Sequence, residues 1–245
     1  MRLPICALLA LLIAAPARAD LPPPSPELTA GIQAYNQGDF TVAFALLSLA
    51  SRHGEAEAMV NQGYMYARGH GVQPDSAYAF ELYKRAAEAG DAEGMNALGY
   101  RYNHANPPDF ERAIHWYCRA IMLGNPRAMN NAGILFFYGQ GGVVKSQDEA
   151  ISLWRQAMAQ GSVNAQVNIG RTLAADSNRS QQERQAGWNY IRDAAFKGSG
   201  AAQNILRSQG DPGPFPPVTE TELNMRLEPR KQVPGVSVLC GQLIS

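Results

Sequence analysis

Residues 79–90 read AFELYKRAAEAG, and this order of a small residue, paired bulky residues, further small residues and a glycine recurs three times. It returns as AIHWYCRAIMLG at 113–124, AISLWRQAMAQG at 150–161 and GWNYIRDAAFKG at 187–198. The final glycines are therefore 34 or 37 residues apart. A period of this length fits one helical hairpin, which cannot bury its apolar face alone and must stack on its neighbours. The pattern predicts a repeat protein.

A second recurring element with small residues and a final glycine precedes each of these blocks, and it is predicted to be the first helix of each hairpin. It lies at Ala58–Gly63, Gly94–Gly99, Ala128–Gly133 and Ala165–Gly170. Its small positions allow the two helices of a hairpin to approach closely. The recurring bulky residues of the second helices are predicted to form the core between repeats; they are Phe80, Tyr83, Trp116, Tyr117, Leu153 and Trp154.

Helix ends are also readable in the sequence. A glycine after the last apolar turn favours a left-handed C-cap, and Asp91, Asn125 and Ser162 then follow as turn or N-cap residues. We therefore predict an all-α fold, a right-handed superhelical solenoid of stacked antiparallel helix hairpins. Its predicted parts are a signal peptide at 1–19, an N-terminal hairpin at 20–55, a repeat array with a C-terminal capping helix at 56–210, and a proline-rich tail at 211–245. The spacing of Tyr35, Gly38-Asp39-Phe40, Ala43 and Leu47 in the N-terminal hairpin resembles that of a tetratricopeptide hairpin.

The first complete unit carries Gly63-Tyr64-Met65-Tyr66, then the loop Gly69-His70-Gly71-Val72-Gln73-Pro74-Asp75, then the block 79–90. This order resembles the Sel1-like repeat, a relative of the tetratricopeptide repeat, and the resemblance covers about residues 56–210. In the second unit, residues 103–109 contain two prolines instead of the glycine loop, and the fourth unit has the polar segment 176–183 instead. The resemblance to exported bacterial members implies an interaction scaffold rather than a catalyst.

The first residues have the pattern of a secretory signal peptide. Arg2 precedes an apolar stretch from Ile5 to Ala15, and Ala17-Arg18-Ala19 fits the site that signal peptidase reads. The apolar stretch is too short to span a bilayer, so no membrane span is expected. We expect cleavage after Ala19 and a periplasmic protein, with release from the cell as the alternative.

Charge and composition restrict the kinds of partner. The 21 basic and 21 acidic residues leave no basic patch that would indicate nucleic acid binding. The expected partner is another protein or an extended peptide in the cell envelope, bound by a monomer without a cofactor. Cys6 would leave with the signal peptide, whereas Cys118 and Cys240 either pair or remain as a half-buried and a free cysteine. The sequence does not decide between these two states.

The first helices of stacked hairpins line the concave face, so their outward side chains form the candidate protein-binding groove. Tyrosine and arginine suit such a surface, and asparagine can bond to an extended backbone. The alternative for any one of these residues is packing within the array. The candidate groove residues are Tyr64, Arg68, Asn96, Tyr100, Asn103, His104, Arg127, Asn130, Phe137, Asn164 and Arg171.

No catalytic motif is found, and the four histidines lack metal-ligand spacing, so neither catalytic nor metal-binding residues are assigned. Three other functions remain in view. They are an immunity protein that neutralises a periplasmic toxin, an enzyme acting on cell-wall or β-lactam substrates, and a structural adaptor. The cysteine-rich branch of the Sel1-like proteins, which is associated with β-lactam hydrolysis, has two cysteines in each repeat. Only Cys118 lies in the repeats here, so the resemblance to that branch fails.

The tail after residue 210 contains several prolines, which exclude a regular helix around positions 212–217. Two readings of it are open. It either folds back on the solenoid, as a cap or as an occupant of the groove, or it is disordered.

Overall fold

The computed structural model describes residues 23–209 and Cys240, and residues 23–209 contain eleven α-helices. Consecutive helices pack against each other along the chain, which confirms the predicted fold of stacked helical hairpins. The predicted signal peptide and the tail, apart from Cys240, lie outside the described residues. The helices are α1 (Pro26–Asn36), α2 (Phe40–Arg52), α3 (Ala56–Arg68), α4 (Ser76–Glu88), α5 (Ala92–Asn103), α6 (Phe110–Met122), α7 (Pro126–Tyr138), α8 (Gln147–Ala159), α9 (Val163–Ala175), α10 (Gln181–Phe196) and α11 (Gly200–Gln209).

Short-range hydrogen bonds define where the helices begin and end. Asp91, Asn125 and Ser162 each accept a hydrogen bond from the backbone N–H three residues ahead, which confirms their predicted role as N-caps. Gly90 and Gly124 follow the ends of α4 and α6 with φ angles of 89° and 80°. Residues with a side chain rarely adopt this left-handed conformation. The glycine that ends each repeat therefore allows the chain to turn from one hairpin into the next.

The two helices of each hairpin touch at a glycine of the first helix. A Cβ atom on Gly99 of α5 would lie 2.7 Å from Cδ1 of Tyr117 on α6. The equivalent atom on Gly63 of α3 would lie 2.5 Å from Cε1 of Tyr83 on α4. Both distances are too short for carbon atoms in contact, so any larger residue would push the helices apart.

The bulky residues of the second helices form the core that the sequence predicts. Tyr83, Tyr117, Leu153 and Trp154 are buried, and the indole of Trp154 donates a hydrogen bond of 3.0 Å to the carbonyl oxygen of Asn130 on α7. The other two predicted core residues, Phe80 and Trp116, are half-buried and pack against the same apolar cluster. The prediction is therefore confirmed for four residues, and the remaining two lie at the edge of the core.

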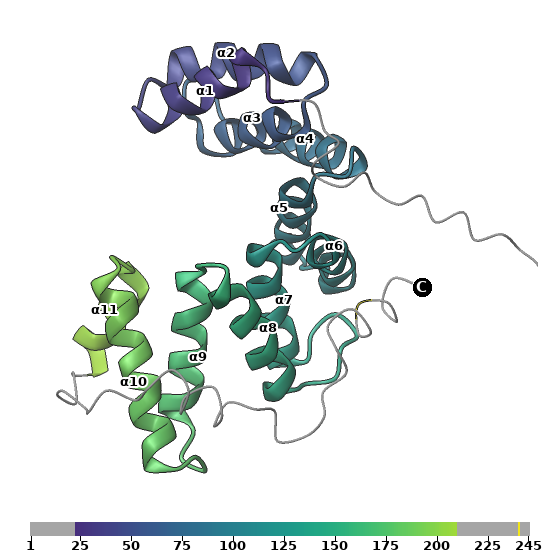
Figure 1. The fold of residues 1–245 in the computed structure, drawn as a ribbon. Helices are drawn as coiled ribbons and strands as arrows, with labels where there is room; N and C mark the ends of the chain where they lie inside the picture. Colours follow the sequence, from purple (N-terminus) through teal and green to yellow (C-terminus); the bar gives the residue numbers. More distant parts are fainter. Residues whose placement is uncertain (1–22, 210–239, 241–245) are drawn as a thin grey trace, which may run out of the picture.

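The hairpins stack into a curved array with α1 and α11 near its two ends (Figure 1). The first helices α1, α3, α5 and α7 contact one another directly from hairpin to hairpin. In a curved stack the layer with the shorter spacing lies inside, so the first helices form the concave layer and the second helices the convex one.

The structure contains a disulfide between Cys118 of α6 and Cys240, with their Cα atoms 5.1 Å apart. Both residues are buried in the core of the central hairpins. The bond joins residues 122 positions apart in the chain, so α7–α11 lie within a covalently closed loop. Because Cys118 lies on a second helix, Cys240 is bonded to the layer of second helices.

Replacing Gly99 by leucine should destabilise the fold, because the new side chain has no space beside Tyr117. We expect a loss of about 3 kcal/mol, as for other overpacked cores, and a melting temperature lower by roughly 5 °C or more in circular dichroism. The matched control is Gly200→Ala at the start of α11, where a Cβ atom would meet nothing within 4 Å. Equal melting temperatures for the Gly99→Leu variant and the unmodified protein would contradict the close helix approach.

Reducing the disulfide should also lower the melting temperature, because the unfolded chain then gains the entropy of an open loop. For a loop of this length we expect a loss of about 2–4 kcal/mol, or roughly 5–15 °C. The measurement is thermal unfolding with and without a thiol reductant. The Cys240→Ser variant should melt at the temperature of the reduced protein and should not respond to the reductant; a response of that variant would assign the effect to another cause.

Candidate functional site

Two columns of side chains extend from the first helices on the concave side. Each first helix contains a glycine that contacts the second helix. The residues of one column lie one position after this glycine, and those of the other column lie five positions after it. These positions are four apart and share a helix face. The first column is Tyr64, Tyr100, Ile134 and Arg171, and the second is Arg68, His104, Tyr138 and Ala175. Tyr100 and Tyr138 are 47% and 58% exposed, which leaves two large rings on this face uncovered.

Glu93, in the first turn of α5, connects three consecutive hairpins. Its Oε1 accepts hydrogen bonds of 2.7 Å from the Tyr64 hydroxyl of α3 and from Nη1 of Arg127 on α7. Its Oε2 accepts a hydrogen bond of 3.0 Å from Nδ2 of Asn125, the N-cap residue of α7. Hydrogen bonds to a charged acceptor are stronger than neutral ones. Glu93 therefore fixes how α3, α5 and α7 are spaced on the concave side.

The protonation states in this network are fixed by their surroundings. Burial raises the pKa of the Tyr64 phenol, and the negative charge of Glu93 raises it further. The hydrogen bond from Arg127 to Glu93 likewise raises the pKa of that guanidinium. At neutral pH Tyr64 is therefore a neutral hydrogen-bond donor and Arg127 a cation.

Asparagines continue the network along α5, α7 and α9. Nδ2 of Asn131 donates to Oδ1 of Asn96 at 3.0 Å, and Nδ2 of Asn168 donates to Oδ1 of Asn130 at 2.9 Å. A longer bond of 3.3 Å from Nδ2 of Asn130 to Oδ1 of Asn131 joins these two pairs. Asn96 and Asn130, both candidate groove residues, are buried and already bonded to neighbouring hairpins. Their position gives them a structural role within the array.

The other candidate residues differ in how far they reach solvent. Tyr100 and His104 are both exposed and stack on each other, with ring centroids 4.0 Å apart. Asn164 and Arg171 of α9 are exposed as well. Arg68 is exposed, and its guanidinium carbon lies 5.8 Å from the ring centre of Tyr64. These five residues are available to a partner on the concave face.

Two candidate residues pack at the edge of the array instead. Phe137 is half-buried, and its ring centroid lies 5.8 Å from that of Trp154. Asn103 is half-buried at the end of α5, and its Oδ1 is buried without a hydrogen-bond partner among the described residues. Both side chains therefore contribute little surface to the concave face.

Sequence reasoning missed Tyr138 and Glu93. Tyr138 has the same position relative to Gly133 that His104 has relative to Gly99, so the repeat register already pointed to it. Glu93 lies six residues before Gly99, as Arg127 lies six residues before Gly133. Arg127 and Asn164 were predicted as groove residues, whereas Glu93, which has the same position in its repeat, was not.

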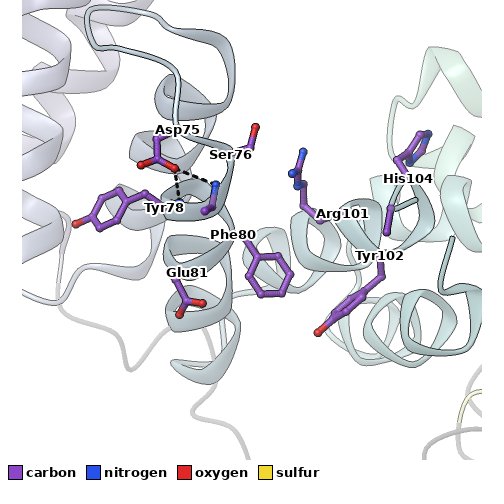
Figure 2. Close-up of a pocket in the computed structure, with 10 residues that line it drawn as sticks. Asp75, Ser76, Tyr78, Phe80, Glu81, Arg101, Tyr102 and His104 are labelled. Atoms are coloured by element: carbon purple, nitrogen blue, oxygen red, sulfur yellow. Dashed lines mark hydrogen bonds between the residues drawn. The ribbon is translucent and has the colours of Figure 1, made fainter. Parts of the chain in front are cut away.

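A pocket of about 640 Å³ opens beside the concave face, between the start of α4 and the end of α5. Figure 2 shows Asp75, Ser76, Phe80 and Glu81 at the start of α4, with the Phe80 ring turned toward α5, where Arg101, Tyr102 and His104 line the other side. The rings of Phe80 and Tyr102 meet edge to face, with centroids 5.6 Å apart. The pocket thus combines aromatic walls with charged residues of both signs.

Among residues 23–209 and Cys240, no group of three or more histidine, cysteine, aspartate or glutamate side chains is placed to hold a metal ion. None of the helices in the same residues has the length and apolar character needed to cross a bilayer.

Comparison with known proteins identifies the repeat and the fold. The family model of the Sel1 repeat matches residues 56–91, 92–125 and 126–162. The first two ranges begin in the first turn of α3 and of α5, and each contains one complete hairpin. The predicted repeat register is therefore confirmed over these residues, while α9, α10 and α11 lie beyond the matched range.

Solved structures from three bacteria are similar to this chain. A protective antigen of uropathogenic Escherichia coli with an SLR fold has a TM-score of 0.62 and 26% identity, over 76% of this chain and 41% of its own. A Sel1 repeat protein from Oxalobacter formigenes has a TM-score of 0.54 and 24% identity, over 77% and 79% of the two chains. An immunity protein from Pseudomonas aeruginosa has a TM-score of 0.58 and 22% identity, over 92% and 84%.

These matches agree with the geometry of the hairpins. The chain spans less than half the length of the Escherichia coli antigen. The Sel1-repeat fold is a helical scaffold that supports protein–protein interaction, which agrees with a concave face of exposed tyrosine and arginine side chains. Residues 56–162 match the Sel1 repeat three times in tandem, and the fold of the chain is similar to that of solved Sel1-repeat proteins.

Proposed function

We propose that this chain is an exported, periplasmic scaffold that binds one partner protein through its concave face. The observation that carries the proposal is the contrast between two sets of residues on that face. Glu93 and the asparagines bond to one another and hold the first helices in place. Tyr100, Tyr138 and Arg171 lie beside them and remain exposed.

Such an arrangement favours tight and specific binding. A rigid backbone loses little conformational entropy when a partner binds. Tyrosine contributes a large apolar area with few rotatable bonds, and arginine contributes directional donors, so both are common among residues that dominate binding energy. We assign the contact to the exposed candidates Arg68, Tyr100, His104, Asn164 and Arg171, with Tyr138 added.

The proposed location rests on the sequence of residues 1–19, which lie outside the described residues. Their basic start, apolar centre and Ala17-Arg18-Ala19 end fit a secretory signal. An oxidising compartment also suits the disulfide between Cys118 and Cys240, because reduced thiols predominate in the cytosol.

A second candidate function is neutralisation of a toxin. The immunity protein from Pseudomonas aeruginosa aligns with 92% of this chain, including hairpins outside the matched Sel1 repeats. An immunity protein would use the same concave face and bind a toxin as its single partner. The two proposals therefore share a surface and differ in the identity of the partner.

Replacing Tyr100 and Arg171 together by alanine should weaken partner binding by at least 100-fold, which corresponds to about 3 kcal/mol. The measurement is an affinity pull-down from envelope extract with residues 20–245, followed by mass spectrometry and titration of the recovered partner. The matched control replaces Arg85 and Phe196, an exposed arginine and an exposed aromatic on second helices, by alanine.

Three outcomes of this experiment differ in meaning. Loss of one stoichiometric partner in the concave variant alone would support the proposal. Equal loss in the control pair would move the contact to the convex side. Reduced helicity of the Tyr100 and Arg171 variant in circular dichroism would mean that these residues stabilise the fold.

The immunity proposal makes a separate prediction. If the recovered partner is a toxin, cells that produce it in the periplasm should survive when they also produce this chain. Survival should decrease by at least tenfold with the Tyr100 and Arg171 variant and remain complete with the Arg85 and Phe196 control. Colony counts after toxin induction provide the measurement, and equal killing with and without the chain would exclude this function.

A further inference from the structure

The loop between α3 and α4 covers the start of the preceding second helix. Gly71 lies so close to the Phe40 carbonyl of α2 that a Cβ atom would collide with it. The imidazole of His70 stacks on the Phe40 ring, with centroids 4.3 Å apart, and its Nδ1 lies 3.0 Å from the Tyr35 hydroxyl. Phe40, the first residue of α2, is thereby packed against a glycine and a ring from the next hairpin and is half-buried.

The loop between α7 and α8 repeats this arrangement two hairpins later. A Cβ atom on Gly141 would lie 2.5 Å from the Phe110 carbonyl oxygen at the start of α6 and 3.2 Å from Cγ2 of Ile114. Val143 in the same loop is buried. In both cases a glycine-containing loop packs on the first residue of the preceding second helix, and that residue is phenylalanine.

The hairpin of α5 and α6 lies between these two, and its loop does not cover the start of the preceding second helix, α4. Its loop, residues 104–109, has Pro107 and Pro108 and contains no glycine. The second helix that it should cover, α4, begins with Ser76 instead of phenylalanine, and residues 75–78 are all exposed. The pocket between α4 and α5 lies beside this exposed start of α4 (Figure 2).

The charges in this pocket favour a basic occupant. Asp75 and Glu81 contribute two carboxylates from the α4 side, and one oxygen of Asp75 already accepts from the N–H groups of the first turn. Arg101 is the one guanidinium among the lining residues. Phe80 and Tyr102 supply aromatic surface on which the aliphatic part of a lysine or arginine can lie.

We propose that this pocket is a docking site for a loop of a partner protein, with a glycine that meets the first turn of α4 and a neighbouring basic side chain. The partner's loop takes the place that the chain's own loops take over α2 and α6. The chain's own loop over α2, which contains Arg68-Gly69-His70-Gly71, has this composition. The pocket adjoins the concave face through His104, which stacks on Tyr100, and it offers a partner a second contact at the edge of the array.

The chain's own loop is a suitable probe for this site. The backbone N–H of Asp75 donates to the Tyr66 carbonyl at 3.0 Å, so the two ends of the loop are adjacent. A peptide of residues 66–75, cyclised through its ends, should therefore keep the loop conformation. In the intact protein the first residues of α2 and α6 already contact a loop of the chain, whereas residues 75–78 at the start of α4 are exposed.

The test is a titration of the intact, oxidised, isotope-labelled protein with this cyclic peptide, followed by NMR. We expect saturable shifts at Ser76, Tyr78 and Tyr102, with a dissociation constant on the order of 1 mM. The same peptide with Gly71→Val should bind at least tenfold more weakly, because a side chain there meets the helix backbone. No saturable shift, or equal binding of the two peptides, would overturn the proposal.

Two protein variants examine the charge requirement. Glu81→Lys should weaken peptide binding at least fivefold, whereas Glu88→Lys, an exposed site on the same helix that does not line the pocket, should leave it unchanged. Equal affinities of the two variants would show that the carboxylate does not select the loop. These measurements change neither Tyr100 nor Arg171. A negative peptide titration would therefore not contradict the concave-face proposal, and unchanged partner binding by the Tyr100 and Arg171 variant would not contradict the pocket proposal.

Discussion

The close contact between the two helices of each hairpin is the constraint on which the array depends. Gly99 and Gly63 allow the rings of Tyr117 and Tyr83 to lie directly on the backbone of the first helix. That approach buries each ring and fixes the rotation of the first helix about its axis, so that the columns of Tyr100 and Tyr138 lie on the concave side. A side chain at either glycine would separate the helices and rotate the columns that carry Tyr100 and Tyr138.

Polar contacts then set how neighbouring hairpins meet. Glu93 receives hydrogen bonds from α3 and α7, and asparagine pairs extend the connection to α9. Buried polar groups are costly when they are unpaired, so each bond also excludes arrangements that would leave its partner unsatisfied. The apolar core provides the stability of the stack, while this network gives its concave face one definite geometry.

Features that depend on residues close in sequence could be predicted, and features that depend on neighbouring hairpins could not. The glycine after each second helix and the N-caps Asp91, Asn125 and Ser162 act locally, so the repeat register and the helix ends followed from the sequence. The burial of Asn96 and Asn130 depends on partners more than 30 residues away, and no local pattern distinguishes them from exposed asparagines. The pocket beside α4 depends on what the next loop lacks, which only the packed structure reveals.

The disulfide between Cys118 and Cys240 makes the two halves of the array unequal toward cleavage of the chain. A cut between α1 and α6 divides the polypeptide into two pieces that only packing holds together. A cut between α7 and α11 falls within the closed loop, and both pieces remain joined through the sulfur atoms. Hairpins on the C-terminal side can therefore lose a peptide bond and still be one covalent molecule, which keeps them at high effective concentration for reassembly.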